Sequence, residues 1–137
     1  MPVVPVLELG VQIFNAIKAL FGFKESLDKV KGERRIRMSG LFDAIAVCLD
    51  DTANQIRAGS YPAGRCQELL TYAVELPTMI EKEVGASKAK EIGDALNGAH
   101  EVERLFAVRT EATGEEQLVK LGEAAGLLRA MSNLLKL

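Results

Sequence analysis

Residue types that could perform chemistry are few and isolated in this chain. His100 is the only histidine, and a lone histidine on a helix is usually structural. The adjacent carboxylates of Asp50–Asp51 and of Glu115–Glu116 point about 100° apart on a helix, so neither pair forms a facing dyad for acid–base catalysis. The ExxH pairs of a di-metal bundle and the glycine-rich loop of a phosphate site are both absent. We therefore expect no enzyme activity, no metal and no cofactor.

The two cysteines, Cys48 and Cys66, lie in helical patterns without a CxxC spacing. Counting helical rises on either side of a turn near Ser60 places them at different levels of an antiparallel helix pair, so we expect no disulfide. Free thiols are typical of a reducing compartment. The N-terminus also lacks a basic leader and a small-x-small cleavage site. These observations favour a cytoplasmic location.

Length and composition predict a single all-α domain over residues 1–137. Hydrophobic residues make up 48% and charged residues 26%, which is ordinary for a globular protein, and the abundant residue types are good helix formers. Short connections make consecutive helices antiparallel neighbours. We expect a four-helix up-down bundle over residues 26–136, with an additional hydrophobic N-terminal helix over residues 1–23 that caps the bundle or packs beside it.

Glycine and proline mark the expected ends of five helices. The first begins near Pro5 and stops at Gly22, and the second starts near Ser26 and is kinked or divided near Gly32 or Gly40. We expect a third helix from Pro62 to Val84 with a kink before Pro77. A fourth helix should be capped by Ser87 and carry its apolar face to Phe106. After a loop over residues 110–114, a fifth helix should start at Glu115.

Residues 1–23 carry more apolar surface than a bundle helix needs. Polar side chains occupy one narrow strip, whereas apolar side chains cover an arc of roughly 200°, against about 100° for a helix lying on a core. Such a helix is either sandwiched inside the domain or meets a partner or a membrane. Glu8 and Lys18 each oppose crossing of a bilayer, so the helix would lie on a membrane. The residues we expect to be buried at rest and to contact lipid on activation are Leu9, Ile13, Phe14, Ile17, Leu20 and Phe21.

The charge of the chain is unevenly placed. Up to Arg37 there are seven basic and four acidic residues, a net charge of +3, and the rest of the chain then carries −5 of the total of −2. A basic segment directly after an apolar helix would be attracted to an anionic membrane, although charge runs on long helices are usually solvated faces. The acidic total disfavours nucleic acid as a partner. The residues expected to contact anionic lipid are Lys29, Lys31, Arg34, Arg35 and Arg37.

Gly122 and Gly126 have the small-xxx-small spacing that lets two helices approach closely. In a soluble bundle this spacing usually marks tight packing inside the fold, and the alternative is a membrane dimer motif. We expect tight packing.

The segments VLELGVQIFNAIKALFG and LFDAIAVCLDDTANQIRAGSYPAGRCQELLTYAVELP give the chain a resemblance to the HeLo, HeLo-like and bacterial Bell-type cell-death-inducing domains. The resemblance covers most of the chain and rests on pattern, not on a sharp motif. It implies a non-enzymatic helical bundle whose N-terminal helix targets the plasma membrane on activation. Such domains usually operate with a signalling amyloid motif or a regulatory domain, and neither is present in this sequence. We therefore expect the chain either to be a fragment of a longer protein or to be triggered by a separate, upstream regulatory protein. The resemblance also implies self-association.

Two functions from different classes follow from these patterns. In the first, the chain is a membrane-targeting, membrane-disrupting or pore-forming cell-death effector of a prokaryotic or fungal immune system, with the N-terminal helix held against the bundle at rest. In the alternative, it is a non-enzymatic interaction or adaptor bundle, and the N-terminal helix is core or a dimer interface. Leakage of liposomes separates the two.

Overall fold

The structure is a computed structural model that describes residues 8–137, except for the side chains of residues 99 and 100. The expectations for the segment that holds Pro5, and for the side chains of Ala99 and His100, lie outside the described residues. All regular secondary structure in the described part is helical, which confirms the all-α class. The elements are α1 (Leu9–Phe21), α2 (Lys24–Asp28), α3 (Gly32–Arg57), α4 (Ala63–Val84), α5 (Ala86–Leu96), the 3₁₀ helix η1 (Asn97–Glu101), α6 (Val102–Ala107) and α7 (Ala112–Leu135).

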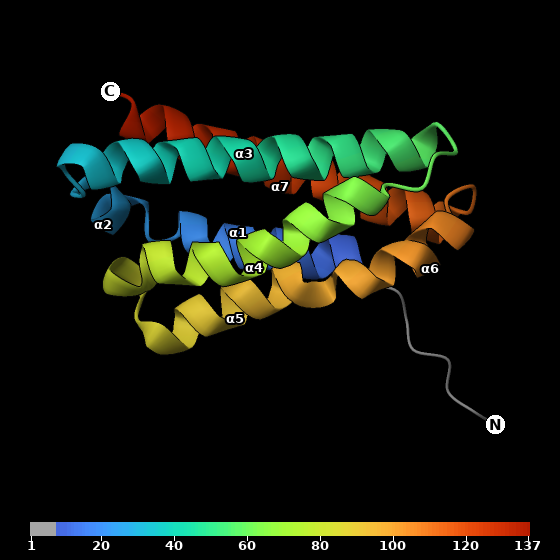
Figure 1. Cartoon of the computed structure of the whole chain (residues 1–137), viewed down its shortest axis with the longest axis horizontal. Coiled ribbons are helices and arrows are strands. Elements are labelled where there is room, and N and C mark those ends of the chain that lie inside the picture. Colours follow the sequence, from blue (N-terminus) through green and yellow to red (C-terminus); the bar gives the residue numbers. More distant parts are fainter. Residues whose placement is uncertain (1–7) are drawn as a thin grey trace.

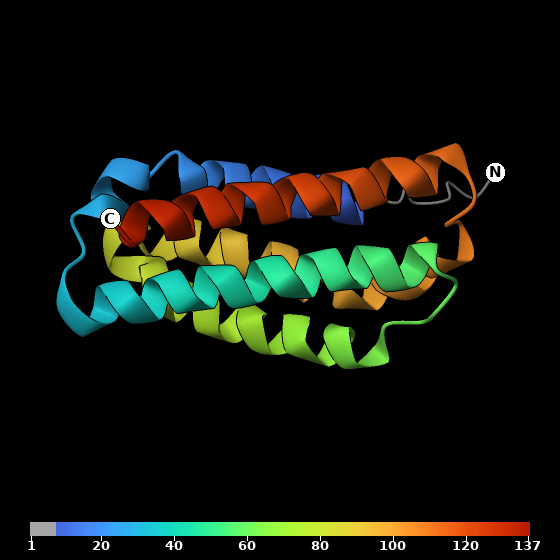
Figure 2. The ribbon, with the colours of Figure 1, turned by 90° about the horizontal axis from the view of Figure 1, so that it is seen from above.

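The long helices lie side by side along the longest axis of the molecule (Figures 1 and 2). α3 packs against α4 and α7, α4 packs against α5, and α1 packs against both α5 and α7. These contacts close a ring in which α1 fills the place between α5 and α7. α3 runs antiparallel to α4 and α7, whereas α1 runs in the same direction as α7 (Figure 2). The N-terminal helix is therefore a member of the ring and does not cap it.

The division between α2 and α3 confirms the expected break near Gly32. α2 ends at Asp28, and Gly32 then begins α3 with a φ of 69°. Only glycine adopts this left-handed conformation without strain. Leu27 and Val30 are buried on either side of the break, so the short α2 is tied to the core by apolar contacts.

The expected fourth helix differs from the structure at both ends. Ser87 is not the cap, because α5 already begins at Ala86 and Gly85, with a φ of 87°, separates it from α4. The helix also does not continue to Phe106, since η1 interrupts it. Gly98 lies in this interruption, and a Cβ there would lie 3.1 Å from Leu9 Cδ1 of α1. The break thus brings the backbone close to the start of α1.

Two glycine predictions on α7 are wrong. The helix begins at Ala112, three residues before the expected Glu115. Gly114 therefore lies in its first turn, where a Cβ would lie 2.0 Å from the carbonyl oxygen of Val108, so only glycine fits. Gly122 and Gly126, by contrast, would meet nothing within 4 Å, and the tight packing expected of them is absent. Spacing alone did not show which α7 glycines face a neighbouring backbone.

Pro77 lies inside α4, which remains one helix from Ala63 to Val84. Because proline has no N–H, the carbonyl of Ala73 loses its usual helical donor. Gly93 of α5 packs against this point, where a Cβ would lie 2.4 Å from Pro77 Cγ and 2.8 Å from the Ala73 oxygen. Because Gly93 of α5 has no side chain, the ring of Pro77 in α4 has room to pack against it.

The core is aliphatic, as the composition predicts, and Phe42 is its largest fully buried side chain. The apolar faces expected on the long helices are mostly buried, whereas Leu41, Cys66, Ala73 and Phe106 are half-buried and Leu70 is 39% exposed. Ser39 of α3 and Ser132 of α7 are also buried, and their hydroxyls lie 2.8 Å apart and reach each other's backbone carbonyls. These small side chains allow α3 and α7 to pack closely.

Candidate functional site

α1 hides the apolar face that the sequence assigned to membrane contact. Leu9, Ile13, Ile17 and Leu20 are each at most 1% exposed. The excess of apolar surface is thus accommodated within the fold, because α1 is held between two neighbouring helices. Whether the same residues contact lipid depends on α1 leaving this place.

The two aromatic residues of α1 are only half-buried. The Lys120 ammonium lies 4.4 Å from the centroid of the Phe14 ring, and the Lys24 ammonium lies 5.0 Å from that of Phe21. A cation over an aromatic face is favourable even at an exposed site. These lysines partly cover the rings, so the outer edge of α1 presents an apolar surface topped by positive charge.

The N-terminal turn of α1 is fastened to α7. The backbone N–H of Val11 donates to the side-chain Oε1 of Gln117 at 3.0 Å, which satisfies one of the free donors of the first turn. At Gly10 a Cβ would lie only 2.1 Å from the carbonyl oxygen of Gln117. We call this pair of contacts, made by Gly10 and Val11 with Gln117, the α1 latch. Sequence reasoning missed it, since a buried glutamine on an apolar helix gives no signal of its partner.

Arg34 belongs to the predicted anionic-lipid cluster, yet it serves the fold. Its guanidinium forms a two-pronged ion pair with Glu83 of α4 and also donates to the carbonyl of Met79. The hydrogen bonds that Arg34 donates to Glu83 raise the pKa of Arg34, although desolvation opposes the shift. Glu83 is only 10% exposed at its side chain. Arg34 therefore joins α3 to α4 and is not free to contact a lipid in this state.

Arg35 is also committed to the fold. Its guanidinium donates to the carbonyls of Leu134 and Leu135, which are among the last residues of α7, and to the carboxylate of Asp28. Cations are favourable at the C-terminal end of a helix, where carbonyls lack donors. Arg35 thus ties the end of α7 to the break between α2 and α3.

Lys29, Lys31 and Arg37 complete the predicted cluster and are exposed. None of the three has an ion pair within residues 8–137. The structure therefore divides the five predicted residues into two that hold helices together and three that are available to a negatively charged partner.

The paired carboxylates are separated, as the helical geometry predicts. Asp50 pairs with Arg129 of α7, whereas its neighbour Asp51 pairs with Arg65 of α4 at 2.5 Å. Glu115 pairs with Arg57 of α3 at 3.3 Å. Within the described part of the chain, no group of three or more histidine, cysteine or acidic side chains is placed to hold a metal ion.

Both cysteines are free thiols. Cys48 is buried and donates to the Arg65 carbonyl at 3.5 Å, one residue before Cys66, so the predicted offset between the two cysteines is wrong. The connection between α3 and α4 runs back along α3 (Figure 1), and the hydrogen bond to Arg65 places the start of α4 level with Cys48. Burial raises the pKa of Cys48 to about 12 and also raises that of Cys66. Neither thiol has the lowered pKa of a reactive cysteine.

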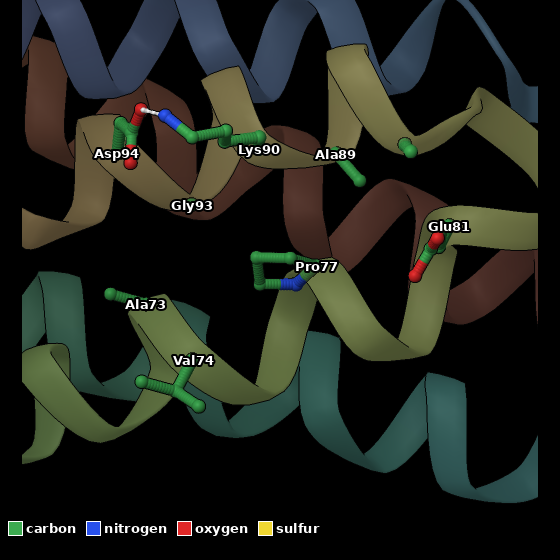
Figure 3. A pocket seen from close by; sticks show the side chains of 9 residues that line it. Ala73, Val74, Pro77, Glu81, Ala89, Lys90, Gly93 and Asp94 are labelled. Atoms are coloured by element: carbon green, nitrogen blue, oxygen red, sulfur yellow. Dashed lines mark hydrogen bonds and ion pairs between the residues drawn. The ribbon is translucent and has the colours of Figure 1, made fainter.

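Besides a hollow of about 420 Å³ between α3 and the end of α7, hollows lie between three further pairs of adjacent helices. The one drawn in Figure 3, of about 350 Å³, lies where Pro77 of α4 faces Gly93 of α5, and an ion pair of 3.1 Å between Lys90 and Asp94 stands at its edge. A second of about 350 Å³ separates α1 from α5 around Ala16 and Ala19.

The third hollow, of about 780 Å³, lies between α3 and α4. We call it the α3–α4 groove. Residues from the N-terminal half of α3 and the C-terminal half of α4 line it, among them Arg37, Leu41, Tyr72, Met79 and Lys82.

None of the helices described in residues 8–137 combines the length and the apolar character that a bilayer-crossing segment requires. Comparison with known proteins gives no family: no protein-family model, no curated protein and no solved structure matches the chain.

Proposed function

We propose that this chain is a membrane-targeting cell-death effector domain in which α1 is stowed at rest and released on activation. The observation that carries the proposal is the place of α1, which is the most apolar helix and fills the gap between α5 and α7 with its apolar face inward. A soluble protein must hide such a face, because large exposed apolar patches cause association. The resting protein would be cytoplasmic and would move to the plasma membrane when α1 is freed.

After release of α1, the other long helices would still be able to form a bundle. The remaining long helices are α3, α4, α5 with α6, and α7, which follow one another through short connections and alternate in direction (Figure 1). They can close into the four-helix up-down bundle expected for residues 26–136 once α5 and α7 come together. The hollow of about 350 Å³ between α1 and α5 means that α1 is less tightly packed on this side. Release therefore mainly requires breaking the contacts with α7, including the α1 latch.

The released helix would lie in the lipid interface with Leu9, Ile13, Phe14, Ile17, Leu20 and Phe21 towards the acyl chains. Its opposite strip holds Gln12, Asn15 and Lys18, which are exposed in the resting fold. An apolar face opposite a polar strip is typical of interfacial helices. Anionic head groups would meet Lys29, Lys31 and Arg37, and self-association or an upstream regulatory protein would be the trigger.

A second candidate, an interaction or adaptor bundle, is favoured by the complete burial of four of the six membrane-assigned residues of α1. In that case α1 is core in every state. The two functions differ in one respect that can be measured, namely whether α1 has to separate from α7.

The test couples α1 to α7 and measures leakage of vesicles that contain phosphatidylserine. Phe14 and Lys120, which touch in the resting fold, are both changed to cysteine in a Cys66→Ala background and joined by a short bis-maleimide. The protein is forced to associate through a fused dimerisation domain. We expect leakage from the protein without the linker and none from the linked protein. Leakage that survives the linker, or no leakage from either, would rule out the effector function.

A charge variant gives an independent arm of the test. Phe14→Glu places a carboxylate on the proposed lipid face, where it opposes insertion, and should abolish leakage. The matched control is Asn15→Glu, which adds the same charge one residue away on the exposed strip and should leave leakage intact. Equal leakage from both variants would contradict the assigned lipid face.

A further inference from the structure

The α3–α4 groove is the largest of the described hollows and is not used by the proposed release of α1. At about 780 Å³ it falls within the range of about 300–1,000 Å³ that small-molecule sites occupy. Leu41, Tyr72 and Met79 form its apolar wall and are half-buried against the core. Ala44 also lines it, and a small side chain at this place leaves room between the two helices.

Positive charge is concentrated at one end of the groove. The ion pair between Arg34 and Glu83 fixes the register of the antiparallel helices α3 and α4, so Arg37 and Lys82 lie near this end. Ala44 and Tyr72 lie near the other end, about 10 Å farther along α3 at 1.5 Å per residue. Among the lining residues the only acidic side chain is Glu75.

Two of the cations at this end are available to a ligand. Arg37 and Lys82 are exposed and have no ion pair within residues 8–137, whereas the charge of Arg34 is balanced by Glu83. With Glu75 counted, the groove and its ion pair carry one uncompensated positive charge. The complementary ligand carries one negative charge at one end and an apolar chain along the rest.

We propose that the α3–α4 groove binds one single-chain amphiphile with a carboxylate head group, of the long-chain fatty-acid class. The carboxylate accepts hydrogen bonds from Arg37 and Lys82, and the chain lies against Leu41, Tyr72 and Met79. A site of this kind combines a mostly apolar lining with a few polar groups that fix the orientation of the ligand. It does not depend on whether α1 is released, so failure of the proposed function leaves this inference open to its own test.

The probe is laurate, titrated as a monomer below its micelle concentration into the full chain without vesicles. Dodecyltrimethylammonium has the same chain length and the opposite charge and is the matched control ligand. We expect laurate to bind with one site per chain and the ammonium ligand to bind at least roughly tenfold more weakly, the difference that one charged contact makes. Equal binding of both ligands would overturn the proposal.

Spectroscopy locates the ligand without any substitution. Methionine methyl groups labelled with ¹³C report on Met79 in the groove wall and on Met38 and Met131, which are both at most 1% exposed in the core. Laurate should shift the Met79 resonance and leave the other two nearly unchanged. A shift of all three resonances, or none at Met79, would exclude the groove as the site.

Variants separate the groove from the remaining basic surface. Arg37→Gln with Lys82→Gln should weaken laurate binding by roughly tenfold or more, whereas Lys29→Gln with Lys31→Gln, outside the groove, should leave it unchanged. Ala44→Phe fills the groove and should abolish binding while the thermal unfolding curve stays cooperative. Sedimentation tests another occupant. A dimer that Ala44→Phe dissociates, together with absent laurate binding, would assign the groove to a second copy of the chain and refute the fatty-acid site.

Discussion

The contact between α1 and α7 and the contact between α3 and α4 solve the same packing problem in different ways. Because Gly10 has no side chain, α1 lies directly on the backbone of α7, and the side chain of Gln117 accepts a hydrogen bond from the Val11 N–H. α3 and α4 are instead bridged by the long side chains of Arg34 and Glu83, and a groove of about 780 Å³ remains between them. The absence of a side chain at Gly10 lets α1 and α7 pack closely, whereas the long charged side chains of Arg34 and Glu83 keep α3 and α4 apart. We call the α1–α7 contact the first seam and the α3–α4 contact the second seam.

The two seams should therefore respond to different substitutions. The first depends on the absence of atoms, so adding a single methyl group should break it. The second depends on charge, so neutralising one partner should weaken it and leave its shape largely intact.

The largest effect should come from Gly10→Ala. The new Cβ would overlap the backbone of Gln117, which has no rotamer to change, so α1 must shift or detach. We expect a loss of about 3 kcal/mol in the free energy of unfolding, at the upper end of overpacking effects, measured by urea titration. The control is Gly126→Ala, on an exposed face of α7 with nothing within 4 Å, which should raise stability by about 0.5–1 kcal/mol. If both variants are equally stable, the backbones of α1 and α7 are not in contact.

Gln117→Leu should have the next largest effect. It leaves the Val11 N–H without its acceptor, and a buried donor without a partner costs about 1–3 kcal/mol. Native-state hydrogen exchange should show faster exchange confined to the first turn of α1. Gln67→Leu places the same substitution on an exposed position of α4 and should change neither stability nor exchange. Unaltered exchange at Val11 in the Gln117 variant would contradict the latch.

Glu83→Gln should weaken the second seam by about 1–2 kcal/mol, because Arg34 keeps a hydrogen-bond partner and loses its countercharge. Glu116→Gln is the control, since Glu116 is exposed and has no ion pair in the described residues. A double-mutant cycle with Arg34→Gln should give a coupling energy between the two side chains. A coupling near zero would show that Arg34 is available to other anions.

Cys48→Ala should have the smallest effect of these substitutions at neutral pH. In alkaline solution it should measurably change how the free energy of unfolding depends on pH. Burial raises the pKa of the Cys48 thiol to about 12 from its ordinary value of 9.0, so between these values the unfolded chain loses a proton that the folded chain retains. The free energy of unfolding should then fall with rising pH, by at most about 1.4 kcal/mol per pH unit from this group. Cys48→Ala should remove most of this slope, and Cys66→Ala, at a half-buried position, should remove less. Identical slopes for the wild type and Cys48→Ala would contradict the burial of the thiol.

Local patterns predicted the helices where the deciding residues are close in sequence. The end of α1 before Gly22, the break before Gly32 and the buried face of α7 follow from glycine placement and apolar spacing. The predicted end of the helix that follows Gly85 was wrong, because η1 interrupts that helix where Gly98 lies close to Leu9 of α1. A sequence does not show which backbone will lie opposite a glycine.

The candidate site was predicted less completely for the same reason. The apolar face of α1 is visible as a pattern, but its latch joins residues 106 positions apart. Arg34 and Arg35 look like members of one basic cluster. Their partners, Glu83 and the end of α7, lie 49 to 100 positions away, so only the three-dimensional structure separates them from the exposed Lys29, Lys31 and Arg37.

Packing the first long helix against the last also affects synthesis of the chain. α1 leaves the ribosome roughly 100 residues before Gln117, and at about 5–20 residues per second its apolar face waits for about 5–20 s before α7 can cover it. During this interval the nascent chain exposes the same side chains that the finished fold hides, at a time when α3, α4 and α5 can already pair through their short connections. Chaperone capture of the nascent chain should therefore begin with α1 and end when α7 emerges.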